Sequence, residues 1–223
     1  MMKFTYVSLF IHQLVNTRNE VFKSRGFFIL ASIALLANCT SSPAKDIWLL
    51  NCSEEDSSSC GYVNQAGEIM IDHEKYLMCL SDTFDNYAIV LKEEDGFVAI
   101  NKAEEVLYHI FLYDNGPDAP AEGLFRIVED EKIGYADVQT GEIKIKPQYV
   151  AARPFENNYA PICPDCETIK DFDHSIWGNG KWGLIDKNGK VVIEPQYNDI
   201  IEISVKGEML VDMEGEEKWV SLK

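Results

Sequence analysis

The sequence predicts an all-β protein built as a tandem array of about four three-stranded units. Three observations lead to this prediction. One pattern recurs along the chain at intervals of about 37 residues, a glycine-containing turn lies inside most copies, and runs rich in β-branched and aromatic residues flank the turns. Because a unit of three strands cannot bury its apolar face alone, we expect neighbouring units to stack.

The recurring pattern is clearest in the segments KWGLIDKNGKVVIEPQY and IGYADVQTGEIKIKPQY, and fainter copies read CGYVNQAGEIMIDHEKY and FVAINKAEEVLYHIFLY. The opening positions are separated by 37, 36, 49 and 37 residues, and the fifth copy is truncated: Cys60, Phe97, Ile133, Trp182 and Trp219. Each full copy reaches a tyrosine 15 or 16 residues later: Tyr76, Tyr113, Tyr149 and Tyr197. We expect these aromatic residues to form core or inter-repeat contacts, with sugar binding by exposed aromatics as the alternative.

Each copy is interpreted as a hairpin followed by a third strand. Asn188-Gly189, between two strand-like runs, indicates a tight turn in which both residues accept positive φ, and Ala66-Gly67 and Thr140-Gly141 occupy the matching site. Pro147 and Pro195 end the second strand, because proline cannot donate to the ladder. The third strands are expected at Tyr87–Leu91, Leu124–Val128, Tyr159–Ile162 and Met209–Val211.

The two ends of the repeat region complement each other. Ile47–Asn51 resembles a third strand without its hairpin, and Trp219–Leu222 resembles a first strand without its partner. Such ends suit either the caps of an open array or the closure of a propeller-like ring, and we favour the open array.

The segment from Lys181 to Tyr197 resembles the WG-repeat family, whose copies open on Trp-Gly, continue with Ile-Asp and an Asn-Gly turn, and end on Val-Ile-x-Pro-x-Tyr. Ile133, Cys60 and Phe97 replace the tryptophan in the other copies, and Val98 replaces the glycine. The resemblance covers about residues 47–223. It implies a β-repeat fold with a binding or scaffold role, and it implies no reaction.

The N-terminal region has the pattern of an export signal. Phe27–Ala37 carries no charge and follows Lys23 and Arg25, and this run is too short to span a bilayer. Leu36-Ala37-Asn38-Cys39 resembles the lipobox of bacterial lipoproteins, although Asn38 departs from the usual small residue. The resemblance implies a lipid on Cys39. We therefore expect a signal peptide at 1–38, a lipidated cysteine and tether at 39–46, and the repeat domain at 47–223, with a later translation start near Val21 as a hypothesis.

The charge distribution bears on partners and location. The formal net charge is −17, and residues 1–38 contribute +3 from four basic residues and one acidic residue, which leaves −20 for the remainder. A region this acidic is not expected to bind nucleic acid or anionic lipid headgroups. Its charge is typical of either a solvated surface or a surface that binds a basic partner. By resemblance to enteric lipoproteins, the lack of aspartate after Cys39 implies an outer-membrane lipoprotein facing the periplasm.

Five cysteines remain besides Cys39, and an oxidising compartment favours disulfides among them. Cys163 and Cys166 have several interpretations: a local disulfide, a metal site together with His174, thiol–disulfide exchange, or free thiols. Cys52 holds the place in its half-repeat that Cys163 holds in the third copy. This correspondence suggests a Cys52–Cys60 pair and leaves one of the group Cys52, Cys60 and Cys79 as a free thiol.

The long step between copies three and four reflects an insertion at about 164–178. Insertions in repeat proteins form loops on one face, which is often the binding face, whereas the alternative is a tolerated surface loop. The candidate binding residues of the insertion are Asp165, Glu167, Asp171, Asp173, His174 and Trp177.

No enzyme signature is present. The sequence lacks G-x-S-x-G, a P-loop, G-x-G-x-x-G and H-E-x-x-H, and its four histidines lie far apart. We therefore expect a non-enzymatic envelope lipoprotein with no cofactor, which presents its repeats to a protein partner. The alternatives are an immunity or inhibitor protein against a basic toxin or enzyme, and a metal-binding protein that uses segment 163–174.

Overall fold

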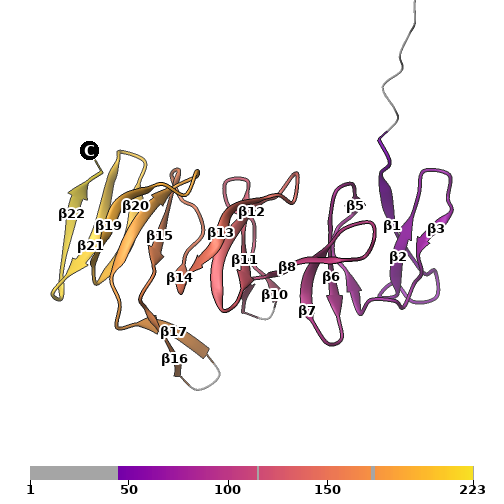
Figure 1. Ribbon diagram of the computed structural model, residues 1–223, viewed down its shortest axis with the longest axis horizontal. Coiled ribbons are helices and arrows are strands. Elements are labelled where there is room, and N and C mark those ends of the chain that lie inside the picture. Colours follow the sequence, from indigo (N-terminus) through magenta and orange to yellow (C-terminus); the bar gives the residue numbers. More distant parts are fainter. Residues whose placement is uncertain (1–44, 115, 172–173, 223) are drawn as a thin grey trace, which may run out of the picture. The chain divides into compact units, whose positions relative to one another are not determined.

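The structure is a computed structural model that describes residues 45–114, 116–171 and 174–222. Every element of regular structure in these ranges is a β-strand, and the strands pair in antiparallel fashion (Figure 1). Within this part of the chain, no helix is long and apolar enough to cross a membrane. The predicted all-β class is confirmed.

The sheets are built from successive three-stranded meanders (Figure 1). The opening strand of each sequence copy lies in the middle of its meander. It pairs on one side with the strand that ended the preceding copy, so each meander combines parts of two copies. The four complete meanders are β1 (Trp48–Cys52), β2 (Cys60–Val63) and β3 (Ile69–Ile71); β6 (Ala88–Lys92), β7 (Gly96–Ile100) and β8 (Val106–Ile110); β11 (Leu124–Glu129), β12 (Lys132–Asp137) and β13 (Ile143–Tyr149); and β15 (Tyr159–Cys163), β18 (Trp182–Asp186) and β19 (Val191–Tyr197).

Short strands connect one meander to the next. After the third strand, the chain crosses to the outer edge of the following unit, where β4 (Met78–Cys79) pairs with β6 and β14 (Ala151–Ala152) pairs with β15. β5 (Thr83–Phe84) returns to pair with β1. The last sheet contains β20 (Asp199–Ser204), β21 (Glu208–Met213) and β22 (Glu216–Ser221). Strands β1 and β22 do not pair with each other, so the array is open as predicted.

One polar residue stabilises the hairpin turn of every full copy. The side-chain oxygen at this position accepts hydrogen bonds from two backbone N–H groups of the turn, as Asp186 does from Asn188 and Lys190 at 2.9 and 3.0 Å. Asn64, Asn101 and Asp137 make the equivalent bonds. These backbone hydrogen bonds, from Thr140 first, hold the pKa of the Asp137 carboxyl below its ordinary value. The Ile-Asp element of the repeat is therefore a turn cap.

The predicted turn type is wrong in one respect. Gly189 has a φ of 78°, but Asn188 is not among the described residues with positive φ. The Gly189 N–H donates to the Asp186 carbonyl, and the Asp186 N–H donates to the Lys190 carbonyl. This is a three-residue loop that ends on a left-handed residue, which is the second common hairpin class. In copy two, Glu104 takes the left-handed position with a φ of 63°.

The glycine after the opening position permits a close approach between strands. A Cβ on Gly183 would lie 2.5 Å from the Ile193 carbonyl oxygen and 2.7 Å from the Pro195 nitrogen, and Gly61 and Gly134 are equally confined by backbone. The pairing of β18 with β19 is irregular on both sides of Leu184, where Trp182 pairs with Tyr197 and Leu184 with Ile193. The extra residues of β19 bulge over the glycine, and the bulge brings the repeat tyrosine back beside the opening residue. Pro147 and Pro195 therefore lie within β13 and β19, and the prediction that they end these strands is wrong.

Copy two lacks this bulge, because Val98 occupies the glycine position. Its register runs evenly past the glycine position, through Val98↔His109 and Ala99↔Tyr108, and shifts only between Ala99 and Ile100. Strand β8 then continues to pair with β11 and merges two meanders into a seven-stranded sheet. As a consequence Tyr113 lies outside the core and is 70% exposed, whereas Tyr76, Tyr149 and Tyr197 are 7% exposed. The prediction that Tyr113 is a core residue is therefore wrong.

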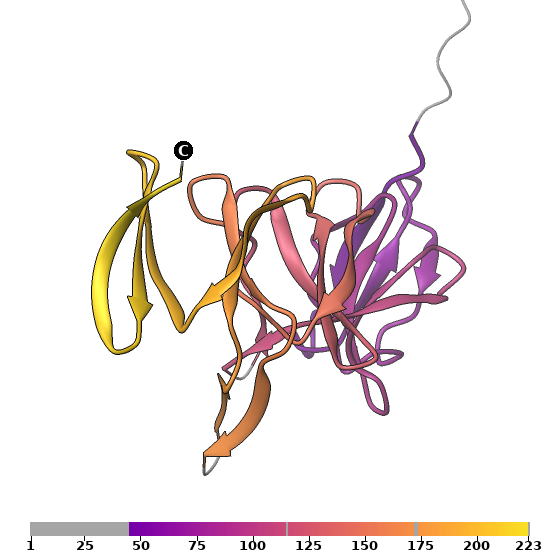
Figure 2. The ribbon, with the colours of Figure 1, turned by 60° about the vertical axis from the view of Figure 1, so that its left-hand side comes forward.

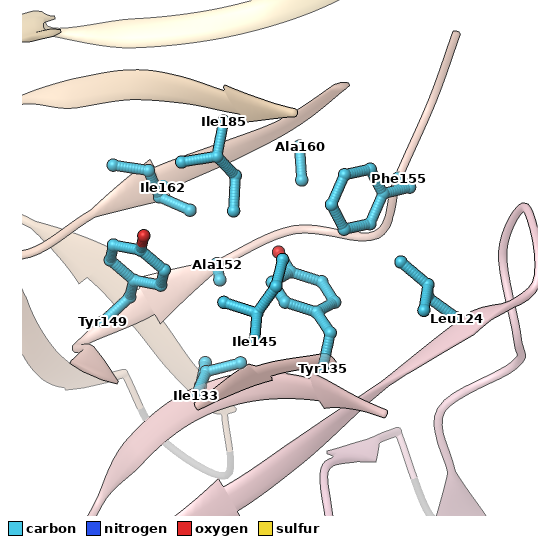
Figure 3. Close-up of a cluster of buried hydrophobic side chains, with 10 residues drawn as sticks. All are labelled: Leu124, Ile133, Tyr135, Ile145, Tyr149, Ala152, Phe155, Ala160, Ile162 and Ile185. Atoms are coloured by element: carbon cyan, nitrogen blue, oxygen red, sulfur yellow. The ribbon is translucent and has the colours of Figure 1, made fainter. Parts of the chain in front are cut away.

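The core lies between successive units. In Figure 3 side chains of β12 and β13 face those of the next meander across a shared apolar layer, and the Tyr135 and Phe155 rings meet edge to face at 4.8 Å. Trp182 is buried as predicted, but Trp219 is 50% exposed, which contradicts the expectation for that position. Trp219 lies on β22, the edge strand of its sheet, and within the described residues no strand other than β21 pairs with β22.

Two disulfides lie within the described residues. Cys52 pairs with Cys60 across the β1–β2 ladder, and Cys163 pairs with Cys166. Both agree with the expected loop closures. Cys79 is a free, half-buried cysteine, and burial raises the pKa of its thiol to about 11. This pairing matches the prediction of one disulfide and one free thiol among the first three cysteines of the repeat domain.

Candidate functional site

The insertion is a β-hairpin, not the irregular loop expected from the sequence. Strands β16 (Glu167–Asp171) and β17 (His174–Gly178) pair in regular register and project away from the sheet that contains β15 and β18 (Figures 1 and 2). The Cys163–Cys166 disulfide lies at its base. Gly180 crosses directly over this disulfide, because a Cβ at this position would lie 2.6 Å from the Cys163 Sγ and from the Cys166 backbone. The base of the hairpin is therefore tightly fixed.

The predicted acidic residues of the insertion have different roles. Asp165 accepts a hydrogen bond from the Lys181 N–H at 3.2 Å, and Glu167 accepts one from the Asn179 side chain at 2.8 Å. Both carboxylates thus stabilise the base of the hairpin. Asp171 and His174 face each other in the ladder, but their side chains and the whole of Asp173 lie outside the described residues.

The remaining predicted positions are placed as follows. The sulfur atoms of Cys163 and Cys166 are bonded to each other, so in this state neither offers a thiolate to a metal. Within the described residues, no group of three or more histidine, cysteine or carboxylate side chains is arranged to hold a metal ion. Cys39 lies outside the described residues.

Trp177 joins the hairpin to the repeat array through tilted ring contacts. Its ring centroid lies 5.9 Å from that of Phe111 and 6.1 Å from that of Trp182, the opening tryptophan of copy four. Two arginines extend this row. The Arg126 guanidinium lies 4.0 Å from the Phe111 ring, and that of Arg153 lies 4.3 Å from the Trp182 ring. The resulting order is Arg126, Phe111, Trp177, Trp182 and Arg153, and we call this row the aromatic ladder.

Arg126 is a buried cation with a complete set of partners. Its Nε and Nη2 donate to the two carboxylate oxygens of Asp118, each at 2.7 Å, and its Nη1 donates to the Ala152 carbonyl at 2.9 Å. The side chains of Arg126 and Asp118 are only 4% and 6% exposed. A bidentate pair with a third hydrogen bond is the geometry needed to offset the desolvation of two charges.

Arg153 also has partners within the protein, although it is more exposed. Its Nη2 donates to Asp199 at 2.7 Å and its Nη1 to the Ile200 carbonyl at 2.5 Å. These bonds connect the stretch after β14 to β20, so the ladder connects successive units as well as the hairpin.

An open groove runs along the ladder, with a volume of about 1020 Å³. Thr168 and Trp177 of the insertion hairpin form one side. The turn of β9 (Leu112–Tyr113) and β10 (Gly116–Pro117) contributes to the other. The remaining lining residues are apolar or charged side chains of the array: Phe111, Asp114, Asp118, Arg126, Val128, Glu131, Ile133, Val150, Arg153 and Pro154.

Two departures from the repeat meet at this groove. One is the insertion hairpin of copy three, and the other is the straight register of copy two, which places Tyr113 and Leu112 at the groove with exposures of 70% and 51%. The sequence identified Trp177 and the insertion but missed Tyr113, Phe111, Asp118, Arg126 and Arg153. The available signals were Val98 at the glycine position and a single arginine inside the apolar strand Leu124–Val128.

The comparisons with known proteins agree with the repeat frame. The family described as "WG containing repeat" matches residues 133–163 and 182–211. The first matched stretch runs from β12 to β15, and the second runs from β18 to β21. Each therefore begins in the opening strand of one copy and ends in the strand that pairs with the next opening strand. Among curated proteins, none matches the chain. The two matched stretches are therefore WG-containing repeats, and the turn caps and confined glycines of the other copies follow the same frame.

Proposed function

We propose that the protein is a non-enzymatic lipoprotein of the bacterial cell envelope, and that its repeat array binds a partner protein in the groove beside the insertion hairpin. One observation carries this proposal: the insertion hairpin of copy three and the altered strand register of copy two contribute residues to the same groove. The hairpin and the displaced Tyr113 arise in different copies, yet both line one groove. Exposed aromatic side chains around a concave surface are typical of binding sites.

The charged groups of the groove favour recognition over chemistry. Asp118, Arg126 and Arg153 are held by ion pairs and hydrogen bonds within the protein. Groups held in this way are poorly suited to general acid or base catalysis, which requires proton exchange with a substrate.

The proposed export and membrane location are supported by the N-terminal sequence. The basic flank, the uncharged run Phe27–Ala37 and the lipobox-like Leu36–Cys39 together support export and lipidation at Cys39. A lipid on Cys39 would place the array next to the membrane surface, in a compartment where both disulfides persist. We propose the outer membrane and its periplasmic face as the location.

The binding proposal is tested by site-specific photocrosslinking in the cell envelope. A photoreactive phenylalanine at Thr168, inside the groove, is expected to capture one envelope protein. The same residue at Val205, which is 84% exposed in the turn between β20 and β21, is the control and should not capture it. Trp177→Ala should reduce the capture from Thr168, because it removes the ring that joins the hairpin to the array. Equal products from both positions would refute binding in the groove.

The lipidation proposal is tested by metabolic labelling with an alkyne fatty acid. The wild-type chain is expected to incorporate the label, and Cys39→Ser should abolish it because the Cys39 sulfur is the atom that carries the lipid group. Cys79→Ser removes the free thiol of the repeat domain and should keep the label. Label that survives Cys39→Ser would contradict the lipobox assignment.

A further inference from the structure

We propose that the groove takes a cationic, extended segment of its partner, rich in lysine or arginine. This inference rests on the proposed function, and it names the chemistry of the ligand at that site. It is argued from the state of the charges in the groove, from the exposed aromatic rim and from the acidic turn beside it.

The two arginines of the groove leave little positive charge for an anionic ligand. Arg126 is neutralised by Asp118 and is almost fully buried, and Arg153 is paired with Asp199. The neighbouring lysines along the chain, Lys132 and Lys170, are not among the residues that line the groove. A phosphate or carboxylate ligand would therefore have to compete with existing bidentate or hydrogen-bonded partners.

The aromatic rim suits a cation. Tyr113 presents most of its ring to solvent, next to the exposed Leu112. An ammonium or guanidinium group placed over such a ring is attracted by the negative face of the π system. The aliphatic stem of the same lysine or arginine side chain can cover Leu112, so that one residue type satisfies both surfaces.

An acidic turn flanks the groove. Glu129, Asp130 and Glu131 join β11 to β12, and all three are exposed. None of them takes part in an ion pair between described residues, and Glu131 itself lines the groove. These carboxylates keep their charge available to a ligand, in contrast to Asp118. The acidity of the whole repeat region would also speed the approach of a basic partner.

The experiment measures binding of three probes to the full-length chain in mild detergent at low salt. The probes are a capped decapeptide of alternating lysine and serine, its glutamate counterpart and neutral chitohexaose. The lysine peptide is expected to bind, and the other two are not. Tyr113→Ala, at a mostly exposed position, should weaken the binding about fivefold through loss of the cation–π contact. The double change Glu129→Gln with Glu131→Gln should weaken it about tenfold.

The control must distinguish the groove from the general acidity of the chain. Glu93→Gln with Glu94→Gln removes the same charge from the equivalent turn between β6 and β7, and it should change the affinity less than twofold. Equal losses from the two double variants would overturn the proposal, as would Tyr113-dependent binding of chitohexaose, which would assign the groove to a glycan. If the crosslink from Thr168 persists while all peptide variants bind alike, the groove binds a partner but this ligand class is wrong. Loss of that crosslink refutes the proposed function first.

Discussion

Replacement of Arg126 by methionine is expected to lower the free energy of unfolding by about 3–5 kcal/mol, the largest effect of any single substitution considered for this chain. The change keeps most of the aliphatic volume but leaves the Asp118 carboxylate buried without its bidentate partner. It also removes the hydrogen bond to the Ala152 carbonyl, which joins β11 to the connecting strand of the next unit. Equilibrium urea unfolding followed by tryptophan fluorescence measures the loss.

Two controls test the cause. Adding Asp118→Val to Arg126→Met removes both charges and should recover most of the lost stability, because no unpaired carboxylate then remains buried. Lys187→Met breaks the Glu122–Lys187 pair, whose side chains are 30% and 37% exposed, and should cost less than about 1 kcal/mol. A similar small loss for Arg126→Met would mean that solvent reaches Asp118 and that the pair contributes as a surface pair does.

The fold could be read from the sequence because the repeat constrains each copy locally. The turn cap at Asp186, the left-handed glycine after it and the glycine at 183 each meet a requirement set by residues close in sequence. The same requirements recur at equivalent positions, so even the degenerate first copy was placed correctly. Strand pairing between copies follows once an array is assumed.

The site could not be read in the same way, because it depends on contacts between copies. Tyr113 fits the repeat frame, and only the even register imposed by Val98 turns it outward. The partners of Arg126 come from a loop before its strand and from the next unit, and Trp177 meets Phe111 across 66 positions of sequence. The spacing of residues along the sequence does not predict such contacts between copies. The insertion was found because it breaks the period, but its hairpin and its contacts are tertiary features.

Gly183→Ala is expected to destabilise the protein by about 3 kcal/mol, although it adds only one methyl group. The added Cβ would meet three backbone atoms of β19 at 2.5–3.0 Å: the Ile193 carbonyl oxygen, the Pro195 nitrogen and the Glu194 carbonyl carbon. A flexible side chain could move aside, but a backbone held in a ladder cannot, so the bulge itself must shift. The bulge places Tyr197 opposite Trp182. The change should therefore also loosen the Trp182 ring, which Trp177 of the insertion hairpin contacts.

The matched control is Gly116→Ala, where an added Cβ has no atom within 4 Å and φ lies outside the left-handed region. Thermal unfolding should show a clear decrease in Tm for Gly183→Ala and almost none for Gly116→Ala. If the close approach is the reason for the glycine, the crosslink from Thr168 should also weaken in Gly183→Ala at temperatures where the protein is still folded. A normal Tm for Gly183→Ala would show that β19 can accommodate a side chain there. The straight register of copy two would then need a cause other than Val98.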